Sequence, residues 1–490
     1  MAPPKLRTLT EAELEQIEAV SFRILEEIGI KFNHRGAIAL LKRAGAKVDE
    51  ENLAARIPRE LVCECLKSAP KDFTLYARDP AYDHPAGGRN VNYGTISGAK
   101  FCIAHDTGDR RECRRRDQEV AARVIDACEH IMHLSLIATP QEVMKEAAYH
   151  HSADLCLKFC RKHLRTLARG AESTREMIAM AEAAAGGAEE LRRRPFISFM
   201  ELTTPPFGHD MSALDGAMEG ARRNFPVWIS SGPITGAASP VTLAGTMALV
   251  NAEVLSSIVV LQLVNPGVPV LYGSFARMMD LKTTQVSLSS PEWCLMRAAT
   301  ADLARLYGLP SFGGSVINAS KTLDIQAGYE KGTTLLMMGL AGLNLPSGML
   351  LDCQNSFSPE DLVINNEVVS YVKRVLRGME VNDESLAFDV MREIGPGGMF
   401  FRSKHTLKHY KTELWVPDLS DRWGWDDWVK AGRKDMVQRA HERVEEILAS
   451  PVPAPLSEKA SAEMDRILAS AEERLSKMEE WSEEFRPAEA

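Results

Sequence analysis

The fold class of this chain is decided by one stretch, which reads Val227-Trp-Ile-Ser-Ser231, then a long helical pattern from Ser239 to Leu263, then Val268-Pro-Val-Leu-Tyr-Gly-Ser274. Two short apolar runs joined by one helix predict a β-α-β unit with parallel strands. Both runs end in small polar residues, as strand ends that face a ligand often do in parallel α/β proteins. We therefore expect the functional site at the carboxyl ends of the strands.

The same alternation of apolar runs and helical patterns continues on both sides of this unit. Short apolar strands separated by helices require a parallel sheet, and eight such repeats predict a TIM (β/α)8 barrel. An open doubly wound sheet is the alternative, but no glycine fingerprint opens a helix after the first strand. The predicted strands are Leu134–Thr139, Leu164–Ala168, Phe196–Leu202, Val227–Ser231, Val268–Ser274, Ser311–Ser315, Leu343–Leu351 and Met399–Arg402.

Three regions are expected along the chain. Residues 1–130 should form an N-terminal cap of helices and short strands, residues 131–425 the barrel, and residues 426–490 C-terminal helices packed on the barrel. Within the cap, Tyr93-Gly-Thr-Ile-Ser-Gly98 has the small residues of a loop that approaches a ligand, and equally those of an ordinary turn. The charged C-terminal patterns carry Leu and Met at helical spacing, which favours packing over catalysis.

Composition narrows the class of protein. The net charge is −9, from 58 basic and 67 acidic residues, and the few arginine clusters are small, so nucleic acid is not an expected partner. The apolar stretch Leu243–Val264 is interrupted by Asn251, Glu253 and Gln262, which argues against a membrane span. No secretory signal is apparent, so the cytoplasm is the expected location. The nine scattered cysteines lack the spacing of a zinc site, and no metal is predicted.

The long helical pattern Ser239–Leu263 carries few charges on any side. Such a helix must be covered by more than solvent. On this basis a homo-oligomer is predicted.

Polar side chains are dense after the sixth and seventh predicted strands. Ser315, Asn318, Ser320, Asp324 and Gln326 follow the sixth strand, and Asp352, Gln354 and Phe357 follow the seventh. Ser320 and Asp324 are equally well explained as helix caps. Parallel strands end at the same side of a barrel, so these two groups are expected to meet at one mouth.

Five segments, taken together, carry a resemblance to a known family: Asp106-Thr-Gly-Asp-Arg-Arg111, Gly232-Pro-Ile-Thr-Gly-Ala-Ala-Ser-Pro-Val-Thr-Leu-Ala-Gly245, Lys321–Glu330, Glu360-Asp-Leu-Val-Ile-Asn-Asn-Glu367, and Gly395-Pro-Gly-Gly-Met-Phe-Phe401 followed by His405-Thr406. In their order and content the chain resembles the trimethylamine:corrinoid methyltransferase superfamily, which includes quaternary-amine methyltransferases acting on betaines. The resemblance implies a TIM barrel that transfers a methyl group from a methylated amine to the Co(I) centre of a separate corrinoid protein.

The resemblance also narrows the substrate. Members that demethylate trimethylamine itself carry pyrrolysine in the barrel, whereas this sequence contains only the twenty standard residues. The chain therefore resembles the non-pyrrolysine branch, whose characterised members favour quaternary amines such as glycine betaine. No cofactor is expected to bind tightly to this chain, because the cobalamin would be supplied by the corrinoid partner.

The chemistry of such a transfer suggests which side chains to seek. A quaternary nitrogen is already positive, so attack on one methyl group expels a neutral amine and needs no general acid; positioning matters most. Aromatic faces hold quaternary ammonium groups, and amides or arginines such as Arg169 and Arg277 would hold a betaine carboxylate. The predicted substrate-binding residues are Tyr93, Glu201, Tyr272, Phe275, Asn318, Gln326, Gln354, Phe357 and Phe401. No catalytic side chain is identified.

Two other functions stay open. The barrel could be catalytically silent and bind or sense methylated amines. Methyl transfer to tetrahydrofolate without cobalt is the other alternative, although no motif for a separate pterin site is apparent. The pair His405 and His409 has helical spacing but no accompanying carboxylate or cysteine, which argues against a metal site there.

Overall fold

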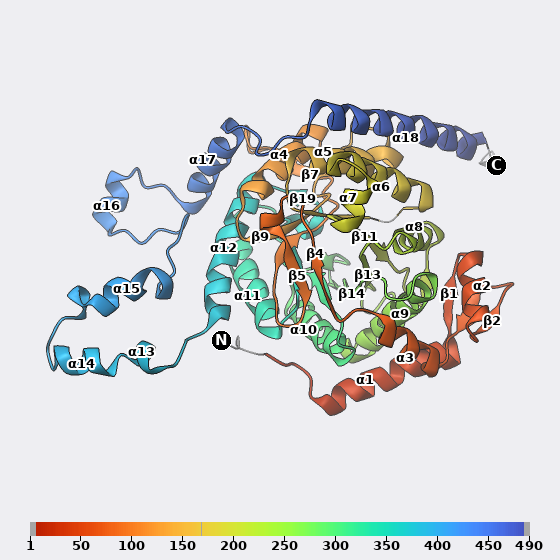
Figure 1. Cartoon of the computed structure of the whole chain (residues 1–490), viewed down its shortest axis with the longest axis horizontal. Helices are drawn as coiled ribbons and strands as arrows, with labels where there is room; N and C mark the ends of the chain where they lie inside the picture. Colours follow the sequence, from red (N-terminus) through yellow and green to blue (C-terminus); the bar gives the residue numbers. More distant parts are fainter. Residues whose placement is uncertain (1–5, 168, 485–490) are drawn as a thin grey trace.

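Eight parallel strands close into a barrel at the centre of the protein, with helices around it (Figure 1). The computed structural model describes residues 6–167 and 169–484. The last strand of the barrel pairs with the first, through Ser347 with Gly94 and Gly348 with Thr95. The predicted TIM barrel is therefore confirmed. In order around the barrel the strands are β6 (Tyr93–Thr95), β9 (Ile131–Ser135), β10 (His163–Leu167), β11 (Ile197–Leu202), β13 (Val227–Ser231), β14 (Val270–Ser274), β17 (Ser311–Gly314) and β18 (Leu345–Gly348).

One of the eight predicted strands is wrong. Residues Met399–Arg402 do not enter the sheet; Phe400–Arg402 form a short 3-10 helix, η5, outside the barrel. Their place is taken by β6, which was expected to be a loop or turn of the cap. β6 is short and has Gly94 at its centre, because the ring of His133 fills the space, only 2.1 Å from where a Cβ would stand. Its sequence therefore lacks the apolar run of a buried strand.

The amino-terminal end of the barrel is closed by a hairpin of β4 (Asp72–Leu75) and β5 (His84–Gly87). Tyr76, directly after β4, accepts a hydrogen bond at 2.7 Å through its carbonyl from Nδ1 of His163 in β10. The ring of His84 stacks on His133 in β9, with 5.9 Å between centroids. A ligand must therefore enter from the carboxyl ends of the strands, as in other TIM barrels.

A ring of helices packs around the strands. Its members are α4 (Arg115–Ala127), α5 (Ala148–Phe159), α6 (Ala171–Ala185), α8 (Met211–Arg222), α9 (Leu243–Val264), α10 (Pro291–Leu306), α11 (Ile325–Ala341) and α12 (Pro359–Arg377). At the N-terminus, α1 (Glu11–Arg23), α2 (Arg35–Arg43) and α3 (Arg59–Ser68) accompany a small sheet of β1 (Ile30–Phe32), β2 (Lys47–Asp49), β3 (Ala54–Arg56) and β12 (Gly208–His209).

Helix α9 is apolar all round because it is enclosed on all sides. It packs on β13 and β14 inside and on α1, α2 and α3 outside. By length and composition it could cross a membrane, but 89% of its most apolar window is buried within the protein. It is thus a core helix, and the cover that its sequence called for comes from the N-terminal helices of the same chain.

The chain leaves the barrel after α12, touches α12 again near Trp415 and Leu419, and packs along the barrel from α17 (Met436–Ala449) onward. Between them, α13 (Asp383–Leu386), α14 (Phe388–Ile394), α15 (Lys404–Glu413) and α16 (Trp425–Lys430) project to the left in Figure 1. We call residues 379–425 the arm. The chain then packs back on the barrel, since α17 contacts α12 and α4, and α18 (Glu458–Glu484) contacts α6 and α5.

Candidate active site

The inside of the barrel carries a buried arginine without an acidic partner. Arg165 of β10 donates hydrogen bonds to the Ser135 hydroxyl at 3.3 Å, the Ser347 hydroxyl at 3.2 Å and the Thr95 carbonyl at 3.0 Å. Its guanidinium also lies 4.9 Å from the ring centroid of Trp228. Burial lowers its pKa to about 9, which still leaves it charged at neutral pH. The barrel interior therefore carries positive charge that the strands themselves do not balance.

Histidines lie beside this arginine and are held neutral. Burial lowers the pKa of His163 to about 3 and that of His133 well below its usual value. Trp228 donates its indole N–H to the Ser198 hydroxyl at 2.8 Å, and the same hydroxyl contacts Nε2 of His163 at 2.7 Å. Because His163 donates from Nδ1 to a carbonyl, its Nε2 accepts the proton of Ser198. The site thus holds neutral imidazoles rather than general acids.

Four aromatic rings form a wall between β13, β14, β17 and α10. Trp228 and Phe312 meet edge to face with 5.0 Å between centroids, and Phe275 lies 6.2 Å from Phe312. Trp293 of α10 donates its indole N–H to the carbonyl of Ser315 at 3.3 Å. Glycines make room for this wall, since a Cβ at position 273 would stand 2.2 Å from the Phe312 ring. The wall gives the region just below the strand ends an apolar, aromatic lining.

Polar atoms without partners gather where these same strands end. Among the described residues, both amide atoms of Asn318 and the hydroxyls of Ser230 and Ser315 are buried without a hydrogen-bond partner. Asn318 is fully buried. An unpaired buried amide or hydroxyl costs about 1–3 kcal/mol of stability. Such groups are therefore kept for a partner outside the chain, and Asn318 can both donate to and accept from it.

Two further arginines lie at this end of the barrel. Arg297 of α10 is fully buried and donates from Nη2 to the Ala276 carbonyl at 2.5 Å, while its Nε and Nη1 have no partner. Arg277, directly after β14, has an unpartnered Nε. Burial, with a smaller contribution from the nearby charge of Arg277, lowers the pKa of Arg297 to about 9. These unpartnered N–H groups suit an anion, above all a carboxylate.

A cleft of about 810 Å³ opens beside the barrel mouth, at the ends of β6, β9 and β10. Thr139 and Arg169 belong to its lining, as do the starts of α6 and α8. The cleft lies on the side of the barrel opposite the β4–β5 hairpin, so a second molecule can reach the strand ends through it.

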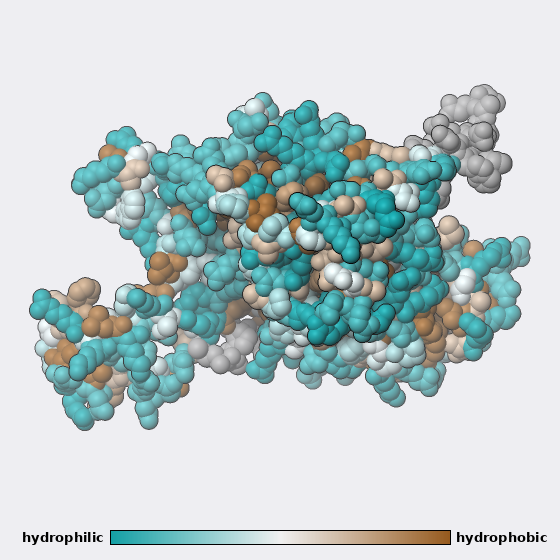
Figure 2. Space-filling view, turned by 45° about the horizontal axis from the view of Figure 1, so that its top comes forward, coloured by the Kyte–Doolittle hydropathy of each residue, from teal (hydrophilic) through white to brown (hydrophobic). Residues whose placement is uncertain are grey.

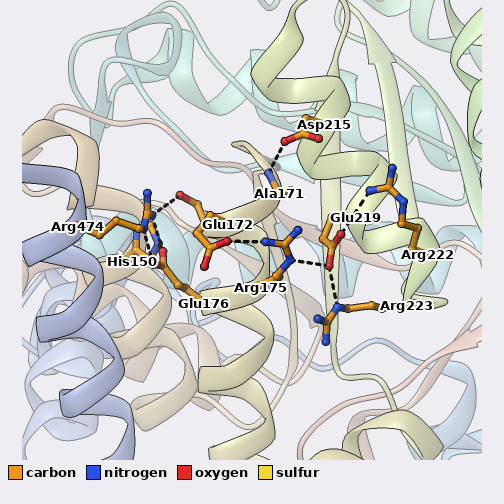
Figure 3. A network of polar contacts seen from close by, with 11 residues as sticks. His150, Ala171, Glu172, Arg175, Glu176, Asp215, Glu219, Arg222, Arg223 and Arg474 are labelled. Carbon is orange, nitrogen blue, oxygen red and sulfur yellow. Dashed lines mark hydrogen bonds and ion pairs between the residues drawn. The ribbon is translucent and has the colours of Figure 1, made fainter. Parts of the chain in front are cut away.

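Ion pairs hold the outer wall of this cleft (Figure 3). Glu176 of α6 accepts from Arg474 of α18 at 2.7 Å and from His150 at 2.8 Å. Burial opposes ionisation of Glu176, but these two hydrogen bonds outweigh it and lower the pKa to about 2. Arg175 donates to Glu219 of α8 at 3.0 Å. The network ties α6 to α8 and to the C-terminal helix.

Five of the nine predicted substrate-binding residues lie in segments that follow the carboxyl ends of strands. Phe275 belongs to the aromatic wall and Asn318 to the unpartnered set. Gln354 donates to the Ser97 carbonyl at 2.8 Å, so it joins the loops after β18 and β6. Gln326 donates to Glu330 at 2.9 Å, and Phe357 is buried in β19 (Ser356–Phe357). Their roles as substrate ligands stay predictions.

The two predicted tyrosines do not face the barrel interior. The Tyr93 hydroxyl donates to the Leu335 carbonyl of α11 at 3.0 Å, and the Tyr272 hydroxyl donates to the Asn251 side chain of α9 at 2.8 Å. Both are fully buried. The prediction placed them by their distance from the strand end, but side chains alternate across a strand, and these two point to the helices.

Glu201 and Phe401 also lie elsewhere than expected. Glu201 is fully buried and accepts from Nδ1 of His209 at 2.7 Å. His209 contacts Ser256 of α9, so Glu201 faces outward from β11. Phe401 lies in the arm and is 78% exposed. Its expected place at the mouth depends on Met399–Arg402 being the eighth strand, and that segment lies outside the barrel.

Several residues of the site were not identified from the sequence, among them Trp228, Phe312, Arg165 and Arg297. Trp228 and Phe312 stand at inward positions of apolar strands, and alternation along these strands could have identified them. Arg165 is a charge in the middle of a predicted strand, which is itself a signal of function. Arg297 lies on a helix among ordinary helix residues and gives no such signal.

Two groups of side chains are close enough to hold a metal ion, among the residues that the structure describes. His105 and His441 both direct Nδ1 at Glu360, at 2.5 and 3.1 Å. Both nitrogens contact the same carboxylate oxygen, Oε1, and the rings are stacked with 4.0 Å between centroids, so each imidazole already has Glu360 as its hydrogen-bond partner. In the other group, Asp117 is already paired with Arg111 at 2.7 Å. Both groups are better explained as hydrogen-bonded clusters.

Comparison with known proteins agrees with this geometry. A family model described as trimethylamine methyltransferase (MTTB) matches residues 2–475. The glycine betaine methyltransferase of Desulfitobacterium hafniense (strain Y51) is 35% identical over 95% of this chain and 97% of that protein. The trimethylamine methyltransferase MttB of D. hafniense (strain DSM 10664 / DCB-2) is 34% identical over 96% and 94%. The solved monomethylamine methyltransferase (MtmB) of Methanosarcina barkeri shares the fold, with a TM-score of 0.52 at 10% identity, over 94% of this chain and 86% of that one.

Proposed function

The chain belongs to the trimethylamine methyltransferase (MTTB) family, and from this premise we propose that it moves a methyl group from a carboxylated quaternary amine, such as glycine betaine, to the Co(I) centre of a separate corrinoid protein. The observation that carries the proposal is a set of three arginines without acidic partners: Arg165 and Arg297, which are fully buried, and Arg277, which is half-buried. Trimethylamine has no anionic group to offer them, whereas a betaine has a carboxylate.

The site offers separate surroundings for the two ends of a betaine. The aromatic wall of Trp228, Phe275 and Phe312 suits the trimethylammonium group, because ring faces attract a cation and exclude water. The unpartnered N–H groups of Arg297 and Asn318 suit the carboxylate. A substrate held at both ends would present one methyl group toward the mouth. Orientation of this kind is the main contribution an enzyme can make to an in-line methyl transfer.

The neutral histidines fit the same reaction. Attack of Co(I) on a methyl carbon breaks the carbon–nitrogen bond and returns its electron pair to nitrogen, so the leaving tertiary amine needs no proton. His133 and His163 are too strongly desolvated to carry a proton at neutral pH. Their part is to fill the barrel and to fix hydroxyls such as Ser198 and Ser347. The corrinoid, supplied by the partner protein, provides the cobalt nucleophile.

The proposal is tested by mixing the protein with a Co(I) corrinoid protein and a panel of trimethylamine, glycine betaine, proline betaine and carnitine. Conversion to methyl-Co(III) is followed by absorbance. We expect methylation with one or more of the carboxylated amines and none with trimethylamine. Methylation by trimethylamine alone would contradict the proposal.

A catalytically silent barrel is distinguished in the same experiment. Binding of a betaine by calorimetry, without methylation of any corrinoid protein offered, would favour a binding or sensing protein. The matched variant is Asn318→Leu, which removes an unpartnered amide without removing any hydrogen bond that its side chain makes within the chain. It should reduce methylation by glycine betaine strongly and leave the fold intact.

A further inference from the structure

The arm exposes an unusual amount of apolar surface. Fourteen of the 25 exposed large apolar side chains of the described chain lie between Met379 and Trp425, a segment of 47 of the 490 residues. Phe388 is 69% exposed, Phe401 78% and Trp425 72%. Figure 2 shows this as brown surface on the part that projects at the left. Patches of this kind on one segment mark an interaction surface.

The arm also has no core of its own. No residue between 378 and 418 is buried. Its helices α13, α14 and α15 have four, seven and ten residues, and isolated helices shorter than about 12 residues are marginal in water. They therefore need packing from another surface to be stable.

The same chain's barrel does not supply that packing. The arm is attached to α12 near its C-terminal end. There Arg374 donates to the Glu413 carbonyl at 2.8 Å, and Trp415 donates its indole N–H to the Ser370 hydroxyl at 2.7 Å. These contacts fix the base of the arm against α12. The helices beyond it face away from the barrel, as Figure 1 shows.

A second unpartnered apolar patch lies on the barrel itself. Ile325 is 89% exposed and Tyr329, one turn further along α11, is 61% exposed. Leu295, on the neighbouring helix α10, is 41% exposed. We call these three residues the α10–α11 patch. The arm helices of the same chain do not pack against α10 or α11, so they leave this patch uncovered.

We propose that the arm docks on a second copy of this chain, each arm covering the α10–α11 patch of the other. One chain carries both halves of such a contact, and a two-fold axis would satisfy both at once. The two halves then form a closed pair without leaving either apolar surface bare.

The size of the arm fits a permanent contact. It holds six exposed aromatic side chains, Phe388, Phe400, Phe401, Tyr410, Trp423 and Trp425. At roughly 150 Å² each when fully exposed, and with 44 to 78% of each exposed here, these six side chains would bury on the order of 550 Å². That is roughly two thirds of the about 800 Å² per partner of a standard interface. A corrinoid protein that comes and goes would leave this surface bare between encounters. A second copy is present at all times and at equal concentration.

The association is tested by sedimentation of the full chain at micromolar concentration. We expect a mass of at least two protomers of 54.1 kDa each. The arm variant Phe388→Glu with Phe401→Glu, and separately the patch variant Ile325→Glu, should weaken association by about a hundredfold or more. The control Leu281→Glu changes a residue that is 72% exposed outside both surfaces, and it should leave the mass unchanged.

A mixing experiment protects this test against variants that merely misfold. An arm variant mixed with a patch variant can form a pair in which one of the two contacts is intact. Partial recovery of the dimer mass on mixing, with neither variant dimeric alone, would support the reciprocal contact. A monomeric native chain, variants that keep the full mass, or no recovery on mixing of two folded variants would each overturn the proposal.

Discussion

The barrel interior and the arm depart from the usual distribution of residues in opposite directions. Inside the barrel, Asn318 and Arg297 are fully buried with unpartnered polar atoms. On the arm, Phe401 and Trp425 are largely exposed. Each arrangement costs stability in the isolated chain, since buried polar groups lose their water and exposed apolar groups order it. Both of our proposals follow from this contrast: a small polar ligand would satisfy the barrel interior, and another apolar surface would cover the arm.

The largest effect on stability is expected from a substitution in β6 of the barrel. Gly94→Ala would place a Cβ 2.1 Å from the ring of His133, inside a closed barrel where no neighbour can move away. We expect the unfolding free energy to fall by about 3 kcal/mol or more. The matched change in the arm, Gly424→Ala, meets nothing within 4 Å and should change the stability little. Urea unfolding of both variants measures the contrast, and equal stabilities would show that β6 does not close the barrel.

The second prediction separates stability from activity inside the barrel. Asn318→Leu removes an amide whose two polar atoms have no partner in the chain. Unfolding free energy should stay the same or rise, whereas kcat/KM for the methyl donor should fall about a hundredfold, which corresponds to about 2.7 kcal/mol. A structural role for Asn318 would instead lower the stability and leave kcat/KM within a few fold.

The same two regions show what the sequence could and could not predict. Seven of the eight predicted strands overlap observed barrel strands, because a strand buried on both faces reads as a continuous apolar run. β6 was missed since its centre is a glycine that accommodates a neighbouring ring. Met399-Phe400-Phe401 has the apolar sequence of a buried strand but lies outside the barrel. The sequence pattern alone does not distinguish a buried strand from an apolar segment on the surface.

The sequence predicted where the site lies better than it predicted which residues form it. Loops after parallel strands identified Asn318 and Phe275, but side-chain direction decided against Tyr93 and Tyr272, and that depends on strand register. Arg297 comes from a helix whose neighbours in space are fixed only by the fold. The feature that indicates a ligand is a buried polar atom without a hydrogen-bond partner, and only the three-dimensional structure can show it.

The third prediction concerns acid. Burial lowers the pKa of His84 to about 4 and that of His163 to about 3, whereas both should titrate near 6.5 in the unfolded chain. Between these values only the unfolded state binds the protons, so stability is complete above pH 6.5 and falls as the pH drops. At pH 5 each of these histidines should lower the unfolding free energy by about 2 kcal/mol relative to its value well above pH 6.5.

The variant His84→Gln checks the origin of this loss. Between pH 6.5 and 5 the unfolding free energy of this variant should fall less steeply than that of the native chain. The slope should be smaller by about 1.4 kcal/mol per pH unit, which is the contribution of one proton. Thermal melting at several pH values gives the slope. An unchanged slope would mean that His84 is not held neutral in the barrel.

The smallest effect is expected at the outer wall of the cleft. Glu176→Gln weakens the contacts of α6 with Arg474 and His150, and should cost about 1.5 kcal/mol. The folded pKa of Glu176 is about 2, so its contribution is present above pH 4.5 and is lost only in strong acid. Hydrogen exchange should show α18 opening more readily while the barrel strands stay protected. Exchange that rises equally in both would contradict local docking.

Calorimetric titration with glycine betaine and with choline shows whether the unpaired arginines of the barrel select a carboxylated quaternary amine. The two share a trimethylammonium group and differ in whether they carry a carboxylate. The account predicts that glycine betaine binds at least about tenfold more tightly than choline, and that Arg297→Met removes most of this preference. Equal affinity for both, or a preference for choline, would contradict it.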